Sequence, residues 1–282
     1  MAFGRDGGSD PGRKRGWDTS AALAALAVLL AAGLLWGAFP TGSEPSTEPA
    51  SQVPILVYHR FDPVAADGTT VTTAVFESQL RRIRDGGYRV IPLRELVACL
   101  RSQAPLPPRA VVLTADDGHR SIYTEMAPRI KRYDFPVTLF IYPSAISNAT
   151  WAMTWGQLGE LQATGLFELQ SHTYWHPNFR KEQRLAPAAY EKFVEAQLLR
   201  SRKILEQRLT GKVDLLAWPF GIYDDWLMAK AQQAGYTAAF TLERRPVRAS
   251  DQIMALPRFL VTNADCGTAF ERLLAGGSCR QP

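Results

Sequence analysis

The sequence is poor in the residues that build disulfide-rich or redox proteins: its 282 residues include only three cysteines and four histidines. An odd number of cysteines excludes a framework in which every thiol is paired. Cys266 and Cys279 flank a short segment and are the candidates for a disulfide in an oxidising compartment, whereas Cys99 in LVACL is expected to be a buried helix residue. Disulfides therefore say little about this fold.

The chain also lacks charge runs and internal repeats. Its formal net charge of +5 comes from 32 basic and 27 acidic residues that are spread along the sequence. No array of basic and aromatic residues accompanies them, so the charge indicates a solvated surface and disfavours a nucleic-acid partner. With 46% hydrophobic residues, the chain is long enough to bury a full-sized core in one large domain or two small ones.

A long uncharged apolar run, AALAALAVLLAAGLLWGAF, occupies residues 21–39. Its length is about the ~20 residues that a helix needs to cross a bilayer. Basic residues precede the run and acidic residues follow it, which predicts a cytoplasmic segment 1–20 and an extracytoplasmic remainder. A cleaved signal peptide is the alternative, but the run is longer than a usual signal core and no small-x-small cleavage site follows. We expect an uncleaved single-pass anchor in the cell membrane.

A solvated linker is expected at residues 40–52, because this segment is rich in Pro, Ser and Glu and has no periodic apolar face. The folded domain is expected to cover residues 53–282. There, helical segments such as FESQLRRIRDGG separate short apolar runs, and the expected strands are PILVYH, YRVI, AVVLTA, VTLFIY, FELQS, DLLAW, AAFTL and ALPRFLV.

Continuous apolar strands that alternate with helices predict a parallel α/β arrangement buried on both faces. Seven or eight strands in this length fit a (β/α) barrel, and an open doubly wound sheet is the alternative. Polar residues fall at the carboxyl ends of these strands: Asp116 and Asp117 follow AVVLTA, His172 follows FELQS, and His59 ends PILVYH. Parallel α/β proteins build their active sites at this edge, so we expect these side chains to meet there.

The motif SHTYWHP, residues 171–177, places two of the four histidines four residues apart. Two adjacent carboxylates resist ionising together unless a cation or a proton offsets their charge. A divalent ion bound by Asp117, His172 and His176 provides that offset and leaves Asp116 free as a base for water. Three protein ligands leave open positions, which is the pattern of a catalytic site. Such ligands suit zinc best, and also cobalt or nickel.

Three strings in this order, LTADDG, SHTYWHP and WPFGIYD, resemble the first three motifs of the polysaccharide deacetylases, the NodB-type carbohydrate esterases. The resemblance covers the chain from about Val53 to the C-terminal region. VPILVYHRF, at the start of the domain, resembles the subgroup that deacetylates poly-β-1,6-N-acetylglucosamine, although this match is less specific. The resemblance implies a distorted (β/α) barrel and a metal-dependent hydrolase that releases acetate from the N-acetyl groups of a polymeric amino sugar.

Carried over by position, the resemblance makes Asp116 the general base and gives the same three metal ligands. It makes His59 the general acid for the leaving amine and the backbone N–H of Phe220 a donor to the oxyanion. Without the resemblance, His59 is more simply interpreted as a buried histidine at a strand end. Ala217 stands where many family members have an arginine that orients the base, and Arg258 in LPRFL is the candidate to supply that charge within the substrate site. An exposed arginine at a strand end is the alternative for this residue.

Trp175, Trp218 and Tyr223 are candidates to stack on sugar rings, although aromatic residues more often belong to a core. Poly-N-acetylglucosamine exopolysaccharide is the favoured substrate; peptidoglycan strands, chitin-like oligomers and O-acetyl esters are alternatives. A non-haem iron oxygenase also uses two histidines and a carboxylate, and a non-catalytic glycan-binding relative is a further alternative. The anchor predicts a domain that faces an exported or cell-wall glycan, with a polysaccharide synthase or export machinery as a possible partner.

Overall fold

The computed structural model describes residues 52–276. The expected membrane anchor at residues 21–39, most of the expected linker, and Cys279 therefore lie outside the described residues. Within 52–276, no helix combines the length and the apolar character that crossing a bilayer requires.

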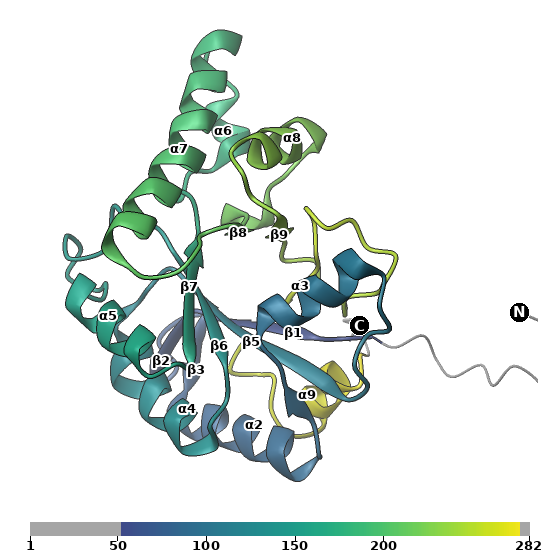
Figure 1. The fold of residues 1–282 in the computed structure, drawn as a ribbon. Helices are drawn as coiled ribbons and strands as arrows, with labels where there is room; N and C mark the ends of the chain where they lie inside the picture. Colours follow the sequence, from purple (N-terminus) through teal and green to yellow (C-terminus); the bar gives the residue numbers. More distant parts are fainter. Residues whose placement is uncertain (1–51, 277–282) are drawn as a thin grey trace, which may run out of the picture. The chain divides into compact units, whose positions relative to one another are not determined.

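A parallel sheet forms the centre of the described region (Figure 1). It contains eight strands, which are β10 (Phe259–Leu260), β1 (Ile55–Tyr58), β5 (Ala110–Asp116), β6 (Val137–Ile141), β7 (Phe167–Ser171), β8 (Leu215–Ala217) and β9 (Ala238–Phe240) in spatial order, with β4 (Arg89–Val90) beside β5. From β5 to β9 the neighbours follow one another in the chain, and β10 returns to pair with β1. In a doubly wound sheet the strand order reverses at one point, and this sheet has no such reversal between β1 and β9. The alternative of an open doubly wound sheet is therefore wrong.

The two ends of the sheet, β9 and β10, are joined less regularly. The chain before β10 bonds to β9 through Ala239 N–H to Ile253 O (3.0 Å), Leu256 N–H to Ala239 O (2.9 Å) and Thr241 N–H to Leu256 O (2.8 Å). These bonds replace a ladder between β9 and β10. The result is a parallel half-barrel, which agrees with the expected (β/α) barrel in strand order and is distorted at this seam.

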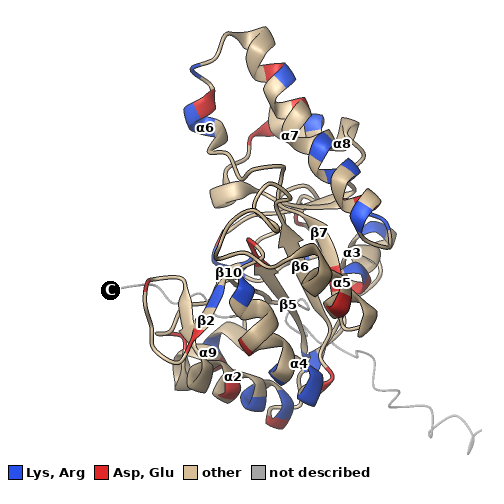
Figure 2. Ribbon diagram, turned by 90° about the vertical axis from the view of Figure 1, so that its left-hand side faces the viewer, with Lys and Arg blue, Asp and Glu red and all other residues tan. Residues whose placement is uncertain are grey.

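Helices surround the sheet (Figure 1). They are α2 (Thr73–Asp85), α3 (Leu93–Ser102), α4 (Ala127–Tyr133), α5 (Trp155–Ala163), α6 (Phe179–Glu182), α7 (Pro187–Arg208), α8 (Asp225–Gln233) and α9 (Gly267–Leu274). Polar side chains start several of them: the Thr154 and Gln157 side chains form a capping box at α5, and Asp224 accepts the Leu227 N–H (2.7 Å) at α8. Acidic and basic residues are interleaved along α2 and α7 in Figure 2.

Alternate residues of each strand face two different cores, because side chains in a strand alternate between its faces. In β5, Leu113 and Ala115 belong to the core that packs under the outer helices, whereas Val112 packs in the barrel interior with Phe140 and with Leu96 of α3. Asp116 lies four residues after Val112 in the same strand, so its side chain points to the same, interior face. The strand pattern thus delivers the base candidate into the barrel at its carboxyl end.

The sequence analysis missed a small ribbon formed by β2 (Arg60–Asp62) and β3 (Thr70–Thr72). Its strands have three residues each, too few for a periodic signal. The connecting loop is closed by Asp67, which accepts bonds from the Thr69 N–H and hydroxyl, both at 2.8 Å. The ribbon matters because Arg60 and Thr69 line the cavity described below.

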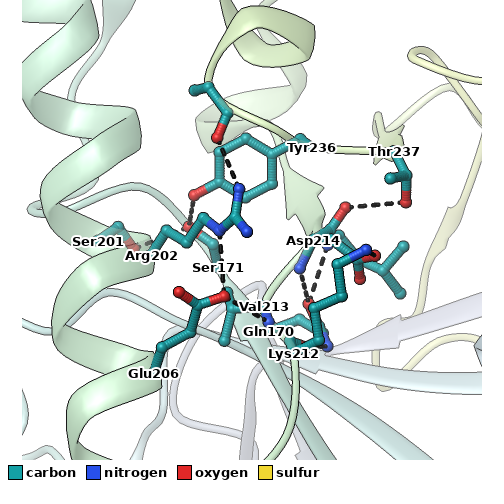
Figure 3. A network of polar contacts seen from close by, with 12 residues as sticks. Gln170, Ser171, Ser201, Arg202, Glu206, Lys212, Val213, Asp214, Tyr236 and Thr237 are labelled. Atoms are coloured by element: carbon teal, nitrogen blue, oxygen red, sulfur yellow. Dashed lines mark hydrogen bonds and ion pairs between the residues drawn. The ribbon is translucent and has the colours of Figure 1, made fainter.

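Gln170 joins β7 to β8 at a point where the ladder is short, since only Ser171 and Leu216 are paired between these strands. Its Oε1 accepts the N–H groups of Asp214 (3.0 Å) and Leu215 (2.9 Å), and its Nε2 donates to the Lys212 carbonyl (3.0 Å) (Figure 3). The amide therefore replaces the missing ladder bonds. It also fixes β8, which carries the loop of the third motif.

Replacement of Gln170 by leucine is expected to lower the free energy of unfolding by about 1–3 kcal/mol, because two buried N–H groups lose their acceptor. Urea denaturation measures the change. Gln162→Leu is the matched control. Gln162 also bonds to the backbone, accepting the Thr210 N–H (2.9 Å) and donating to the Thr210 carbonyl (2.6 Å), but at a solvent-accessible position. Its replacement is expected to change stability by only about 0.5 kcal/mol. Equal losses in the two variants would show that Gln170 has no special role.

Candidate active site

The three expected metal ligands come together at the carboxyl ends of β5 and β7. Asp117 follows β5 directly, and His172 and His176 lie in the loop after β7. One ligand atom from each residue lies within 4.8 Å of the other two. The Asp117 Oδ1 atom is 3.6 Å from His172 Nε2 and 3.7 Å from His176 Nε2. These distances are too long for hydrogen bonds and short enough for one ion to contact all three side chains.

The donor atoms fit a divalent cation. Asp117 Oδ1 is buried and has no hydrogen-bond partner among the described residues, which is costly unless a ligand binds it. His172 Nδ1 donates to the Ala217 carbonyl (2.8 Å), so its Nε2 carries the lone pair that a metal needs. Burial, followed by the neighbouring His172, lowers the pKa of His176 to about 4 and keeps this imidazole neutral.

The backbone of the site is held in a conformation that side chains rarely adopt. Asp117 (φ 71°), Thr173 (φ 62°), His176 (φ 62°) and Phe220 (φ 57°) all have positive φ. Such residues cost of order 1–3 kcal/mol each and cluster at functional sites. The Thr173 hydroxyl accepts the His176 N–H (3.2 Å) and closes the turn between the two histidines. Part of the backbone strain of the protein is therefore located in the loops around the candidate metal ligands.

Asp116 is held by a bidentate ion pair with Arg258. The two guanidinium nitrogens donate to the two carboxylate oxygens, each at 2.8 Å, and both side chains are buried. Burial disfavours the charge of Asp116, but the charge of Arg258 prevails and holds the pKa of this carboxyl at about 2. Asp116 is thus ionised and oriented. The alternative of an exposed Arg258 at a strand end is wrong. The expectation that Arg258 belongs to the substrate-binding residues is also wrong, because complete burial of its side chain excludes direct contact with a substrate.

His59 lies beside the carboxylates, immediately after β1. Its Nδ1 atom is buried and has no hydrogen-bond partner among the described residues. Burial lowers the pKa of His59, and the charges of Asp116 and Asp117 oppose this shift. His59 thus lines the same cavity as the candidate base, and one of its ring nitrogens is bonded by no protein group of the described region.

A cavity of about 230 Å³ is lined by His59, Asp116, Asp117, His172, His176 and Phe220. Phe220 stands at its mouth with 56% of its surface exposed, and its ring centroid is 4.5 Å from that of His176. The sequence analysis assigned a role only to the backbone of Phe220. The structure shows that its ring also lines the cavity beside the candidate metal ligand His176.

The three aromatic residues expected to stack on sugars lie in different places. Trp218 lies two residues after Leu216, whose side chain faces α7 and α8. Its ring therefore points to the same side and is fully buried there. Its Nε1 donates to the Met254 carbonyl (2.9 Å). The stacking expectation for Trp218 is wrong, since the ring has no exposed face. Tyr223 is half-buried and donates to Glu243 (2.7 Å). Trp175 is 44% exposed beside His176.

Tyr142 is a site residue that the sequence analysis missed. It follows β6, and its ring centroid is 5.3 Å from that of His176. Burial and then the charge of Asp117 raise the pKa of its hydroxyl, so the phenol stays protonated. The rule that located the other residues, a polar group at the carboxyl end of a parallel strand, would have found this tyrosine at the end of VTLFIY.

A parallel half-barrel with a candidate base and three candidate metal ligands at the carboxyl ends of its strands is an arrangement suited to hydrolytic enzymes. The model of the polysaccharide deacetylase family matches residues 103–239, a range that contains the candidate base Asp116, the three candidate metal ligands and Phe220. The chain therefore carries a polysaccharide deacetylase domain, and the resemblance that its motifs predict is confirmed.

Similar proteins agree with this assignment. The chain is 25% identical over 245 residues to the poly-beta-1,6-N-acetyl-D-glucosamine N-deacetylase of Escherichia coli (strain K12), a match that covers 74% of this chain and 36% of that protein. It is 26% identical over 210 residues to the protein of the same name from Staphylococcus aureus (strain MRSA252), covering 73% of this chain and 71% of that one. The solved structure of IcaB from Ammonifex degensii superposes with a TM-score of 0.70 at 25% identity and covers 80% of this chain and 96% of that chain.

Proposed function

We propose that this protein hydrolyses N-acetyl groups of a polymeric amino sugar, with poly-N-acetylglucosamine as the favoured substrate. The observation that carries the proposal is the convergence, in one cavity, of the ionised Asp116 with the triad of Asp117, His172 and His176. The names of the relatives from Escherichia coli and Staphylococcus aureus support the choice of polymer. Zinc is the favoured ion, and cobalt and nickel suit the same ligands.

A divalent ion held by the triad would supply a Lewis acid and lower the pKa of water. Asp116 is placed to accept a proton from that water, and Arg258 keeps this carboxylate ionised and aimed into the cavity. The positive φ of Phe220 belongs to the tight turn of residues 219–221. Pro219 has no N–H and the Gly221 N–H donates to the Trp218 carbonyl (2.9 Å), so the Phe220 N–H is the candidate donor to the oxyanion. The residues of the chain thus supply a base, an arginine that orients the base, and a backbone N–H donor for the oxyanion.

The leaving amine needs a proton, because an amine departs poorly as an anion. We assign this step to His59, whose ring lines the cavity and whose Nδ1 atom has no protein partner in the described region. Burial lowers the pKa of His59, and the charges of Asp116 and Asp117 oppose that shift. Proton donation at a substrate nitrogen contributes about 10²- to 10⁴-fold in rate in enzymes of this kind.

The assignment of His59 is tested by the His59→Gln variant. We expect kcat for an N-acetylated oligomer to fall about 10²- to 10⁴-fold. Hydrolysis of 4-nitrophenyl acetate is expected to change far less, because its leaving group departs as an anion without a proton. Equal losses on the amide and the ester would contradict the role of His59 as an acid.

Other acetylated substrates remain in the same chemical class. Peptidoglycan strands, chitin-like oligomers and O-acetyl esters present the same acyl group to the cavity, whereas a non-catalytic glycan-binding relative would bind the polymer without releasing acetate. An oxygenase is disfavoured, since the triad lies on a parallel half-barrel and not on the double-stranded antiparallel scaffold of those enzymes. The distinguishing experiment offers each glycan to the metal-loaded protein and measures acetate.

We also propose that residues 21–39 anchor the protein in the cell membrane and place the domain outside the cytoplasm, where it meets an exported or cell-wall glycan. The apolar run and the flanking charges support this placement. A polysaccharide synthase or exporter is then a fitting partner beside the anchor. A reporter enzyme fused after Pro282 is expected to be active outside the cytoplasm, and activity confined to the cytoplasm would overturn the proposal.

A further inference from the structure

Four aromatic rings form a continuous line that begins at the catalytic loop and ends on α8. The ring centroids are 6.0 Å apart between Trp175 and Phe193, 6.5 Å between Phe193 and Tyr190, and 5.3 Å between Tyr190 and Trp226. Phe193 and Tyr190 belong to α7, and Trp226 to α8. We call these four residues the aromatic track.

We propose that Trp175 and Trp226, the exposed ends of the aromatic track, bind sugar rings of a glycan chain beyond the residue held in the catalytic cavity, and that Phe193 and Tyr190 support them from below. This inference rests on the proposed function and deepens it, because it names the surface that would bind the part of the polymer outside the cavity. Aromatic rings present flat apolar faces with polar edges, and such faces match the C–H faces of pyranose rings.

The track is continuous with the active site. Trp175 lies in the loop between His172 and His176, so one end of the track starts beside the metal ligands. The Trp175 N–H donates to Gln197 Oε1 (3.1 Å), and Gln197 is a buried residue of α7. This bond fixes the ligand loop to the helix that carries the middle of the track.

A second contact makes the same connection from the sheet. The Ser171 and Ser201 hydroxyls are 2.8 Å apart, and the Tyr236 hydroxyl donates to Ser171 (2.8 Å), as Figure 3 shows. Ser171 ends β7 and Ser201 belongs to α7. The helix therefore keeps its register with the strand that leads to His172, and the track keeps its position relative to the catalytic residues.

The two ends of the track are open to solvent and its middle is supported. Trp175 and Trp226 are 44% and 40% exposed, whereas Tyr190 is buried and its hydroxyl donates to the Phe179 carbonyl (3.3 Å). Tyr190 lies nearly parallel to Trp226, with 23° between the rings. Large aromatic groups left in water are unfavourable, so their exposure at both ends of a rigid line points to a ligand that covers them.

A glycan fits this surface better than a folded protein does. A specific protein interface buries about 800 Å² on each partner, and two partly exposed tryptophans on a narrow line offer far less. Polar groups border the track: Lys230 lies 5.6 Å from the Trp226 ring centroid and pairs with Glu191 and Glu195. Apolar faces edged by charged groups match the alternating C–H and hydroxyl groups of a sugar chain.

The test compares Trp226→Ala, Trp226→Phe and wild type in the full chain on two substrates, a long N-acetylglucosamine polymer and the corresponding disaccharide. We expect the ratio of kcat/KM for the polymer to that for the disaccharide to fall about 2- to 10-fold in Trp226→Ala, mainly through KM, since a lost stack is worth about 0.5–1.5 kcal/mol. Trp226→Phe keeps a ring and is expected to restore most of the ratio. Leu199→Ala, which removes another exposed apolar side chain (51%) from α7, is expected to leave the ratio unchanged.

Binding of the polymer, measured by retardation in gels that contain it, separates this inference from the proposed function. Weaker retardation of Trp226→Ala than of Leu199→Ala supports the track, whether or not acetate is released. If wild type releases acetate and Trp226→Ala matches it in both the ratio and the retardation, the track does not bind glycan. If wild type shows neither acetate release nor retardation, the proposed function and the track fail together.

Discussion

Replacement of Arg258 by methionine is expected to lower the free energy of unfolding by about 3–5 kcal/mol, because it leaves the Asp116 carboxylate buried without its partner. Both guanidinium bonds to this carboxylate are 2.8 Å long, and Arg258 also donates from Nε to the Thr241 carbonyl (3.1 Å). No other cation touches Asp116 within the described residues. Thermal or urea unfolding measures the loss, and acetate release is expected to fall with it since the base loses its orientation.

The control is a double-mutant cycle. Asp116→Asn alone is also expected to destabilise the protein, because it leaves the Arg258 charge buried and unpaired. The double variant with Asp116→Asn and Arg258→Met removes both charges, so we expect it to be more stable than the sum of the two single losses predicts. Simple additivity of the two losses would show that the ion pair does not hold the base in solution.

Replacement of His172 by alanine is expected to abolish both metal binding and acetate release. In wild type stripped with a chelator, zinc at about 100 times its dissociation constant should stabilise the fold by about 2.7 kcal/mol, an effect that does not depend on any substrate. The variant should lose that stabilisation, since one of the three ligand atoms is gone. Thermal unfolding with and without zinc, cobalt or nickel is the measurement.

His119→Ala is the matched control for the metal experiment, because His119 is the one histidine of the sequence that lies outside the cavity lining. Its Nδ1 lies 2.8 Å from the Ser121 hydroxyl. We expect this variant to keep the metal-induced stabilisation. A loss as large as that of His172→Ala would place the ion elsewhere, and no stabilisation of wild type by any of the three metals would contradict the triad.

The sequence predicts most of the sheet and the location of the site, because both depend on local patterns. Apolar runs such as AVVLTA coincide with strands, and the rule that parallel strands expose their carboxyl ends at one edge brings Asp116, Asp117 and His172 together. The pairing of Asp116 with Arg258 is different: the two residues are 142 positions apart. Sequence reasoning names this arginine as a candidate, and only the fold shows that its charge meets the base.

The direction of the side chain explains why the stacking expectation for Trp218 was wrong. Trp218 follows directly after β8 and borders the cavity, but one position decides which side of the strand its ring takes, and the ring is buried among residues that face the helices. Motif spacing carries no information about that choice, whereas the alternation of Leu215 and Leu216 between two cores does. The aromatic track was equally invisible in the sequence, since three separate elements supply its rings.

The most direct test of the account is to measure acetate together with the free amines formed when the purified full chain acts on poly-N-acetylglucosamine oligomers. The measurement is made on metal-stripped protein, on protein given zinc, cobalt or nickel, and on Asp117→Ala treated in the same way. We predict equal amounts of acetate and free amine, a requirement for metal, and no product from Asp117→Ala. Acetate without free amine would indicate an ester substrate, and absence of acetate from metal-loaded wild type on every N-acetylated glycan would contradict the deacetylase proposal.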